Sequence, residues 1–189
     1  THSTIDWKNV GNTTVTKVKA HGPSQQYRIQ ASLYGMGLQN EGERVERNCI
    51  YFLPSNKTSL GDALPWETRF DPEPGKWALA RAQLLVNLMD NARKALDSGG
   101  NIYVWQEMLP DGCRVRVLDN GRGIPPEALA HLTEAFYRVD KSRSRAQGGA
   151  GLGLSLCNEI VQLHGGTMQF ESRVGNGTVV TVELKGGRV

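Results

Sequence analysis

The most constraining feature of the chain is a cluster of four glycines within residues 148–153 that runs directly into an apolar helical pattern. A plain linker would stay small and polar, whereas apolar residues recur here with largely helical spacing, at Leu152, Leu154, Leu156, Ile160, Val161 and Leu163. The glycines therefore open a packed helix. Free N–H groups at a helix start, with no Cβ atoms nearby, favour an anion site. A mobile loop followed by a helix is the alternative.

Composition limits the class of protein. The 189 residues are 39% hydrophobic and 22% charged, as in an ordinary globular protein, and the net charge of +3 indicates no nucleic-acid partner. Cys49, Cys113 and Cys157 form no Cys-x-x-Cys pair, so a reducing compartment fits better than a disulfide framework or a zinc site. No run approaches the roughly 18 apolar residues of a membrane span, and no signal peptide is visible. We therefore expect a soluble chain without membrane contact. It could still be one piece of a longer, membrane-bound protein.

Two regions of different character are expected. Residues 1–66 read mostly as strand and turn, and the alternation of Tyr27, Ile29, Ala31 and Leu33 predicts a strand that forms a long hairpin over residues 26–53. The segment TTVTKVKA is a further candidate strand. Four prolines make residues 54–75 the expected linker. The role of residues 1–66 is unassigned, and residues 67–189 form the second predicted domain.

The second region alternates helices and strands. From Trp77 to Ala95 the apolar residues have helical spacing, and NIYVWQEM and CRVRVL around LPDG predict a strand pair. PPEALAHL predicts a short helix, and TMQFES and TVVTVEL around RVGNG predict a second hairpin. This order predicts an α+β fold, a two-layer sandwich of a mixed, mainly antiparallel sheet covered on one face by helices.

Candidate ligand-binding residues lie on the helix LLVNLMDNARKAL. Asn87 and Asn91 are four residues apart and share one face, with Asp90 just off it and Lys94 three residues after Asn91. Amide oxygens can hold a hydrated Mg²⁺ ion, and a lysine can face a phosphate. A solvated polar helix face would look much the same.

Two further segments add polar groups. In DNGRGIP, residues 119–125, Asp119 can accept a hydrogen bond from an exocyclic amine, while Gly121 and Gly123 permit close approach of a ligand. An ordinary Asp-x-Gly turn is the alternative. Residues 134–147 then supply a basic segment, which is either a solvated loop or a lid over phosphates, with Arg138, Lys141, Arg143 and Arg145.

These segments, in this order, resemble the ATP-binding catalytic domain of sensor histidine kinases, within the gyrase, heat-shock chaperone, histidine kinase and MutL ATPase superfamily. The similarity covers roughly residues 77–185. NLMDNARKA (87–95) is similar to the N box, DNGRGIP to the first glycine box and EAFYRVD (134–140) to the phenylalanine box. GGAGLGLS (148–155) is similar to the second glycine box and GNGT (175–178) to the last one. The resemblance implies a Bergerat-type ATP-binding fold.

The resemblance also implies roles for individual residues. Asn87 and Asn91 would coordinate Mg²⁺, Lys94 and Arg138 would contact phosphates, and Asp119 would recognise the adenine amine. The glycine run would form part of an ATP lid, with Leu152 and Leu154 packing beneath it. Further nucleotide contacts are expected from Gly121, Gly123, Ile124, Lys141, Gly149, Gly151, Leu152, Gly153, Leu154 and Thr178.

Three functions stay open at this stage. A histidine kinase domain would transfer the γ-phosphoryl group of ATP to a histidine on a separate dimerisation domain, would serve a response regulator and would be cytoplasmic. That acceptor domain is not recognisable in this sequence, and neither His131 nor His164 is a credible acceptor. A superfamily ATPase would need a general base, which Asn87 cannot be and for which Asp90 is the nearby carboxylate. A non-catalytic nucleotide-binding module is the third reading.

Overall fold

The computed structural model describes residues 2–96, 99–139 and 150–185. The chain divides into two compact units, the first ending at Leu79 and the second starting at Ala80. The division lies inside helix α3 (Glu73–Ala95). Within the described ranges, no helix is both long and apolar enough to cross a membrane.

The first unit contains a three-stranded sheet and two helices. Strand β1 (Ser3–Val10) pairs in parallel with β2 (Arg47–Pro54), and β2 pairs antiparallel with β3 (Leu64–Arg69). Helices α1 (Asn12–His21) and α2 (Gln25–Asn40) supply the rest of its core, and a 3₁₀ turn, η1 (Leu60–Asp62), precedes β3. This core contains Val10, Val15, Val18, Ala31, Ile50 and Phe52.

The hairpin expected over residues 26–53 is wrong, and so is the strand expected at TTVTKVKA. Both segments are helical, in α2 and α1. The alternation of apolar residues in α2 hides a helical stripe, because Tyr27, Ala31 and Gly35 recur every four residues and lie buried or half-buried on one side. The predicted strand RNCIYFL is confirmed as β2, but its partners are β1 and β3. The latter lies within the expected linker.

A mostly buried ion pair lies between sheet and helix in this unit. Lys8 Nζ is 2.9 Å from Asp6 Oδ2, and the two side chains are 18% and 13% exposed. Lys8 also donates to Gln30 Oε1 on α2 at 2.8 Å. Together these contacts join the inner face of β1 to α2.

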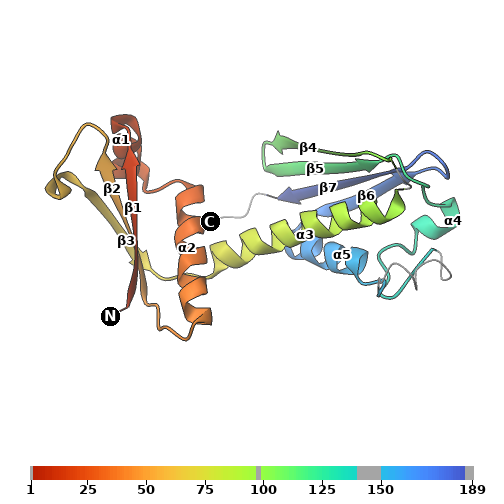
Figure 1. The fold of residues 1–189 in the computed structure, drawn as a ribbon, viewed down its shortest axis with the longest axis horizontal. Coiled ribbons are helices and arrows are strands. Elements are labelled where there is room, and N and C mark those ends of the chain that lie inside the picture. The colour runs from red at the N-terminus through yellow and green to blue at the C-terminus, as the bar shows by residue number, and fades with distance from the viewer. Residues whose placement is uncertain (1, 97–98, 140–149, 186–189) are drawn as a thin grey trace. The chain divides into compact units, whose positions relative to one another are not determined.

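The second unit has the predicted α+β architecture in two layers (Figure 1). Its sheet has the order β4-β5-β7-β6 and is antiparallel throughout, so the mixed sheet of this chain is the three-stranded one. The strands are β4 (Ile102–Leu109), β5 (Gly112–Asp119), β6 (Thr167–Ser172) and β7 (Thr178–Lys185). Helices α3 and α5 (Gly153–Leu163) pack on one face, and the short α4 (Pro126–Leu129) follows β5.

The two long helices fix the core of this unit. From α3, Leu84, Leu88 and Ala92 form a buried stripe with a spacing of four residues. They meet Cys157, Ile160 and Val161 of α5 and four buried strand residues, Cys113, Val117, Val182 and Leu184. This packing sets the rotation of α3 about its own axis, and with it the direction of every polar side chain on the helix.

Candidate functional site

The two asparagines of α3 lie beside the core stripe and are half-buried. Asn87 Oδ1 accepts a hydrogen bond from Gln83 Nε2 at 2.9 Å. The Nδ2 atoms of Asn87 and Asn91 are both buried and have no hydrogen-bond partner among the described residues. A buried amide without a partner costs free energy, so this pair of side chains requires an explanation beyond packing.

The start of α5 lies directly against Asn91. A Cβ atom at Gly153, the first residue of α5, would be 3.4 Å from Asn91 Nδ2. Any larger side chain would therefore compete with the asparagine for space. The glycine run and the asparagine helix, 62 positions apart between these two residues, thus form one site at which the open N-terminus of an 11-residue helix faces an amide.

Cys157, one turn further along α5, lies beneath Asn87. Its side chain is fully buried, and burial raises the pKa of the thiol to about 11, although the neighbouring amide of Asn87 lowers it. The thiol therefore stays protonated at neutral pH. It serves as a small apolar floor under the asparagine.

Asp119 occupies the end of β5. Its side chain is 4% exposed, and Oδ1 accepts a hydrogen bond from the N–H of Gly121 at 2.9 Å. Burial raises the pKa of Asp119, while hydrogen bonds from the backbone of Gly121 and Thr178 and the charge of Arg122 lower it. A carboxylate held this deeply favours a ligand that donates a hydrogen bond to it.

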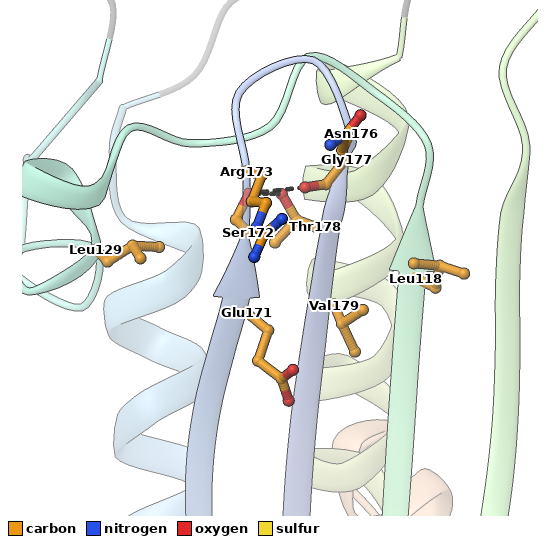
Figure 2. Close-up of a pocket in the computed structure, with 9 residues that line it drawn as sticks. All are labelled: Leu118, Leu129, Glu171, Ser172, Arg173, Asn176, Gly177, Thr178 and Val179. Atoms are coloured by element: carbon orange, nitrogen blue, oxygen red, sulfur yellow. Dashed lines mark hydrogen bonds between the residues drawn. The ribbon is translucent and has the colours of Figure 1, made fainter.

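Neighbouring strands place Thr178 beside Asp119. Asp119, Thr178 and Ser172 are cross-strand neighbours on β5, β7 and β6. Thr178 Oγ1 is 2.9 Å from Ser172 Oγ, which donates to the carbonyl of Gly177 at 2.7 Å, as Figure 2 shows. Ser172 Oγ also accepts from the N–H of Ile124 at 2.9 Å. The first and last glycine boxes are therefore joined through one serine hydroxyl.

Ser172 is the residue that the sequence reasoning missed. It lies in the strand segment TMQFES, outside every glycine box, and a single serine in a strand carries no periodic or spacing signal. Its role depends on strand register, which places it next to Thr178. Predicting which residues of β6 and β7 lie opposite each other would have identified Ser172 as the neighbour of Thr178.

The end of α3 is tied to the same loop. The N–H of Arg122 donates to the carbonyl of Ala95 at 3.1 Å, which links the C-terminal turn of α3 to the segment after Asp119. Lys94 is half-buried in that last turn. The lysine is therefore held close in sequence and structure to the loop that carries Gly121 and Gly123.

The phenylalanine box meets the second glycine box through the backbone. The N–H of Phe136 donates to the carbonyl of Gly151 at 3.0 Å. Arg138 follows two residues later and is half-buried. Leu154 packs against the core, and Leu152 is 43% exposed. Lys141, Arg143, Arg145 and Gly149 lie outside the described residues.

A cavity of about 420 Å³ lies at the β6–β7 end of the sheet (Figure 2). Of the predicted site residues, only Thr178 lines it. Leu118, Val179 and Glu171 are cross-strand neighbours there and point to the side of the sheet away from the helical core. The cavity thus adjoins the Asp119 end of the site but does not contain the asparagine pair. Its lining residues are Leu118, Leu129, Glu171, Ser172, Arg173, Asn176, Gly177, Thr178 and Val179.

Comparison with known proteins agrees with this geometry. Residues 79–188, more than half of the chain, match the family model of the histidine kinase-, DNA gyrase B- and HSP90-like ATPases. The chain belongs to this family. Residues 79–188 include all five sequence boxes.

Related proteins include named histidine kinases. The circadian input-output histidine kinase CikA of Synechococcus elongatus is 43% identical over 102 residues, which are 53% of this chain and 13% of that protein. The sensor protein kinase WalK of Staphylococcus saprophyticus is 31% identical over 160 residues, 78% of this chain and 26% of that protein. The chain thus spans about a quarter or less of these relatives.

Among solved structures, the mycobacterial sensor histidine kinase MprB matches with a TM-score of 0.51 at 28% identity. The match covers 65% of this chain and 78% of that one. The predicted kinship with histidine kinase ATP-binding domains is confirmed by sequence and by fold.

Gly177 provides a test of how the site is held together. Its φ of 83° is left-handed, and a Cβ atom there would collide with the carbonyl oxygen of Asp119. Gly175 also has a left-handed φ, of 81°, but open space around it. We expect Gly175→Ala to cost about 1–2 kcal/mol of unfolding free energy, the left-handed penalty alone. Gly177→Ala should cost distinctly more in urea denaturation, and equal costs would contradict the close packing on Asp119.

Burial of Asp119 predicts that protonating this side chain stabilises the folded chain, so that the free energy of unfolding depends on pH. Because its pKa is raised above 3.8, the folded chain holds the proton more tightly than the unfolded chain. The stabilisation that protonated Asp119 contributes is fully present below pH 3.8, the ordinary pKa of the group. It is lost as the pH rises through the raised pKa of the folded chain. We expect Asp119→Asn to be more stable than the parent at neutral pH, with the difference narrowing as the pH falls. Urea unfolding across this range measures it, and a less stable variant at neutral pH would contradict the dominance of burial.

Proposed function

We propose that this chain is the ATP·Mg²⁺-binding catalytic domain of a two-component sensor histidine kinase. In this role it positions the γ-phosphate of ATP for transfer to a histidine on a separate dimerisation domain. The observation that carries the proposal is the pair of buried amide nitrogens of Asn87 and Asn91, which have no hydrogen-bond partner among the described residues, together with the start of α5 against Asn91. Such a site contributes position and charge rather than a nucleophile, which is what phosphoryl transfer requires.

The asparagine pair fits a magnesium ion. Within the described part of the chain, no three His, Cys, Asp or Glu side chains gather to hold a metal. Amide oxygens are ligands that Mg²⁺ accepts when the remaining positions are filled by water and phosphate oxygens. Since the oxygen and nitrogen of an amide exchange places by a simple flip, the buried amide of Asn91 is placed to supply such an oxygen, and Asn87 would supply one if its hydrogen bond from Gln83 were released. Bound there, the ion would neutralise charge on the phosphates.

Asp119 would select the base. Its carboxylate is desolvated and retains acceptor capacity beyond the hydrogen bond from Gly121. Adenine presents an exocyclic amine that can donate to it. The neighbouring Thr178 and the backbone of Gly121, Gly123 and Ile124 would line the same end of the site.

Cations and backbone N–H groups would hold the phosphates. Lys94 lies one turn after Asn91 on α3, and Arg138 follows the segment that bonds to Gly151. The N-terminus of α5 at Gly153 adds helix N–H groups and a partial positive charge. By resemblance to the family, Lys141, Gly149, Leu152 and Leu154 belong to the lid over the same ligand.

The position of Asp90 favours transfer over hydrolysis. A hydrolytic ATPase needs a carboxylate that activates water, and Asn87 cannot act as that base. Asp90 is 51% exposed and lies 3.4 Å from Arg93 on the outer surface of α3. It therefore points away from the stripe formed by Asn87 and Asn91. A non-catalytic regulatory module that holds nucleotide, or none, is the remaining alternative, and titration with ATP identifies the form that binds none.

The acceptor and the downstream partner are proposed from family kinship. His131 lies 2.7 Å from Glu134 Oε1 on the surface, and His164 Nδ1 lies 2.7 Å from the carbonyl of Ile160. We assign the phosphoacceptor to another domain, with a response regulator as the next partner. The need for ATP places this domain in the cytoplasm.

Calorimetric titration tests the metal assignment. Asn91→Ala should remove the Mg²⁺ dependence of ATP binding and leave Mg²⁺-independent nucleotide binding in place, because it deletes an amide ligand and not the adenine contact. Asp119→Asn should weaken nucleotide binding with or without Mg²⁺ by about 1.5–3 kcal/mol. Asp90→Asn is the matched control on the same helix and should bind like the parent. A Mg²⁺ response that survives in Asn91→Ala would refute the assignment.

ATP binding and phosphoryl transfer to histidine should be separable in the isolated chain. We expect the purified chain to bind ATP but to accumulate no acid-labile phosphohistidine from labelled ATP, because the acceptor is supplied by another domain. Adding a dimerising histidine hairpin from the same parent protein should restore labelling, and Asn91→Ala should abolish it. Strong histidine labelling of the isolated chain would place the acceptor within it. Rapid release of phosphate without phosphoprotein would favour the ATPase reading.

A further inference from the structure

Three amide side chains follow one another along α3. Gln83, Asn87 and Asn91 are spaced by four residues, so they form one file beside the apolar core stripe of the helix. Gln83 is exposed, whereas Asn87 is half-buried. Gln83 Nε2 donates a hydrogen bond to Asn87 Oδ1 at 2.9 Å. Gln83 lies outside the five sequence boxes, and the proposed function gives it no role.

The hydrogen bond from Gln83 determines which atom of the Asn87 amide is buried. The oxygen, the atom that a metal ion requires, accepts from Gln83, while the nitrogen is buried without a hydrogen-bond partner among the described residues. A glutamine four residues from an asparagine ordinarily stabilises a solvated helix. Here the buried nitrogen adds a desolvation cost that a solvated pair does not have. A cation on the side where Nδ2 lies would reverse this orientation.

Gln83 can pair with Asn87 in either orientation. Its own amide carries both an N–H donor and a carbonyl acceptor. When Asn87 turns over, Gln83 can turn as well and accept from Asn87 Nδ2, so the hydrogen bond between the two side chains is kept. The thiol of Cys157, which neighbours Asn87 from α5, is only a weak donor and a weak acceptor. Gln83 is therefore the stronger of these two partners in fixing the amide.

We propose that Gln83 is a positioning residue that sets which atom of the Asn87 amide faces the cation. When Gln83 donates, it holds the Asn87 oxygen to itself, and when it accepts, it leaves that oxygen for the ion. The inference rests on the proposed function, because the cation is the Mg²⁺ that accompanies ATP. A side chain at position 83 that only accepts favours the metal-binding orientation, and one that only donates opposes it.

Calorimetry on two variants tests this direction. Gln83→Glu places an acceptor beside Asn87 and Gln83→Lys places a donor there, at an exposed position that accommodates a charge. We define the Mg²⁺ response as the ratio of the ATP affinity with Mg²⁺ to the ATP affinity without it. Gln83→Glu should raise this response and Gln83→Lys should lower it, each by about two- to tenfold beyond a control of the same charge. This is the range that one hydrogen bond contributes.

The controls for charge are at the neighbouring residue. Ala82 is exposed and points away from Asn87 on the helix, so Ala82→Glu and Ala82→Lys add the same charges without reaching the amide. If the Gln83 variants change the Mg²⁺ response no more than these controls, the role of Gln83 is refuted, while ATP·Mg²⁺ binding stands. A parent chain that binds ATP without any Mg²⁺ response refutes the metal assignment of the proposed function and this inference with it.

NMR of the side-chain amides in the parent chain gives a readout that does not depend on added charge. Without nucleotide, the NH₂ protons of Asn87 should show nuclear Overhauser contacts to Cys157. When ATP and Mg²⁺ are added together, these contacts should weaken and those to the Gln83 side chain should strengthen, whereas ATP alone should change neither. Contacts that stay the same with ATP and Mg²⁺ bound would overturn the proposal even if both Gln83 variants failed to fold.

Discussion

The packing of α3 on the sheet is the constraint on which the rest of the site depends. Leu84, Leu88 and Ala92 fix one side of the helix against β5, β7 and α5. With that rotation set, Asn87 and Asn91 must point to the seam with α5. The polar atoms are therefore placed by apolar contacts, and a small rotation of α3 would displace both amides together.

The buried polar groups of the site lower the stability of the fold. Asp119 lies at the end of β5 in a nearly dry position, and burial raises its pKa. A neutral isostere would suit the fold better, whereas a buried acceptor suits a ligand that donates a hydrogen bond. The buried Nδ2 atoms of Asn87 and Asn91, which have no hydrogen-bond partner among the described residues, show the same pattern. Both features follow when the missing partners belong to a ligand.

The sequence was sufficient for the family and for the α+β fold of the second unit, because five motifs recur in a fixed order. Asn87 and Asp119 stand out because amides and carboxylates are mostly exposed, and the glycines around Gly151 stand out by their spacing. It was insufficient for α2, where Tyr27, Ile29, Ala31 and Leu33 satisfy a strand pattern by chance, while the helix is selected by packing against β2. It was also insufficient for Ser172, whose importance arises from register with Thr178, a long-range property.

The backbone at Phe136 stores free energy in the phenylalanine box. Its φ of 67° is left-handed, which costs a bulky residue about 1–2 kcal/mol, and its side chain is 71% exposed. Exposed aromatic surface does little to offset that cost, and the hydrogen bond to Gly151 holds the conformation in place. The hydrogen bond from the amide of Phe136 therefore holds a strained backbone conformation, and its loss would release the free energy that this strain costs.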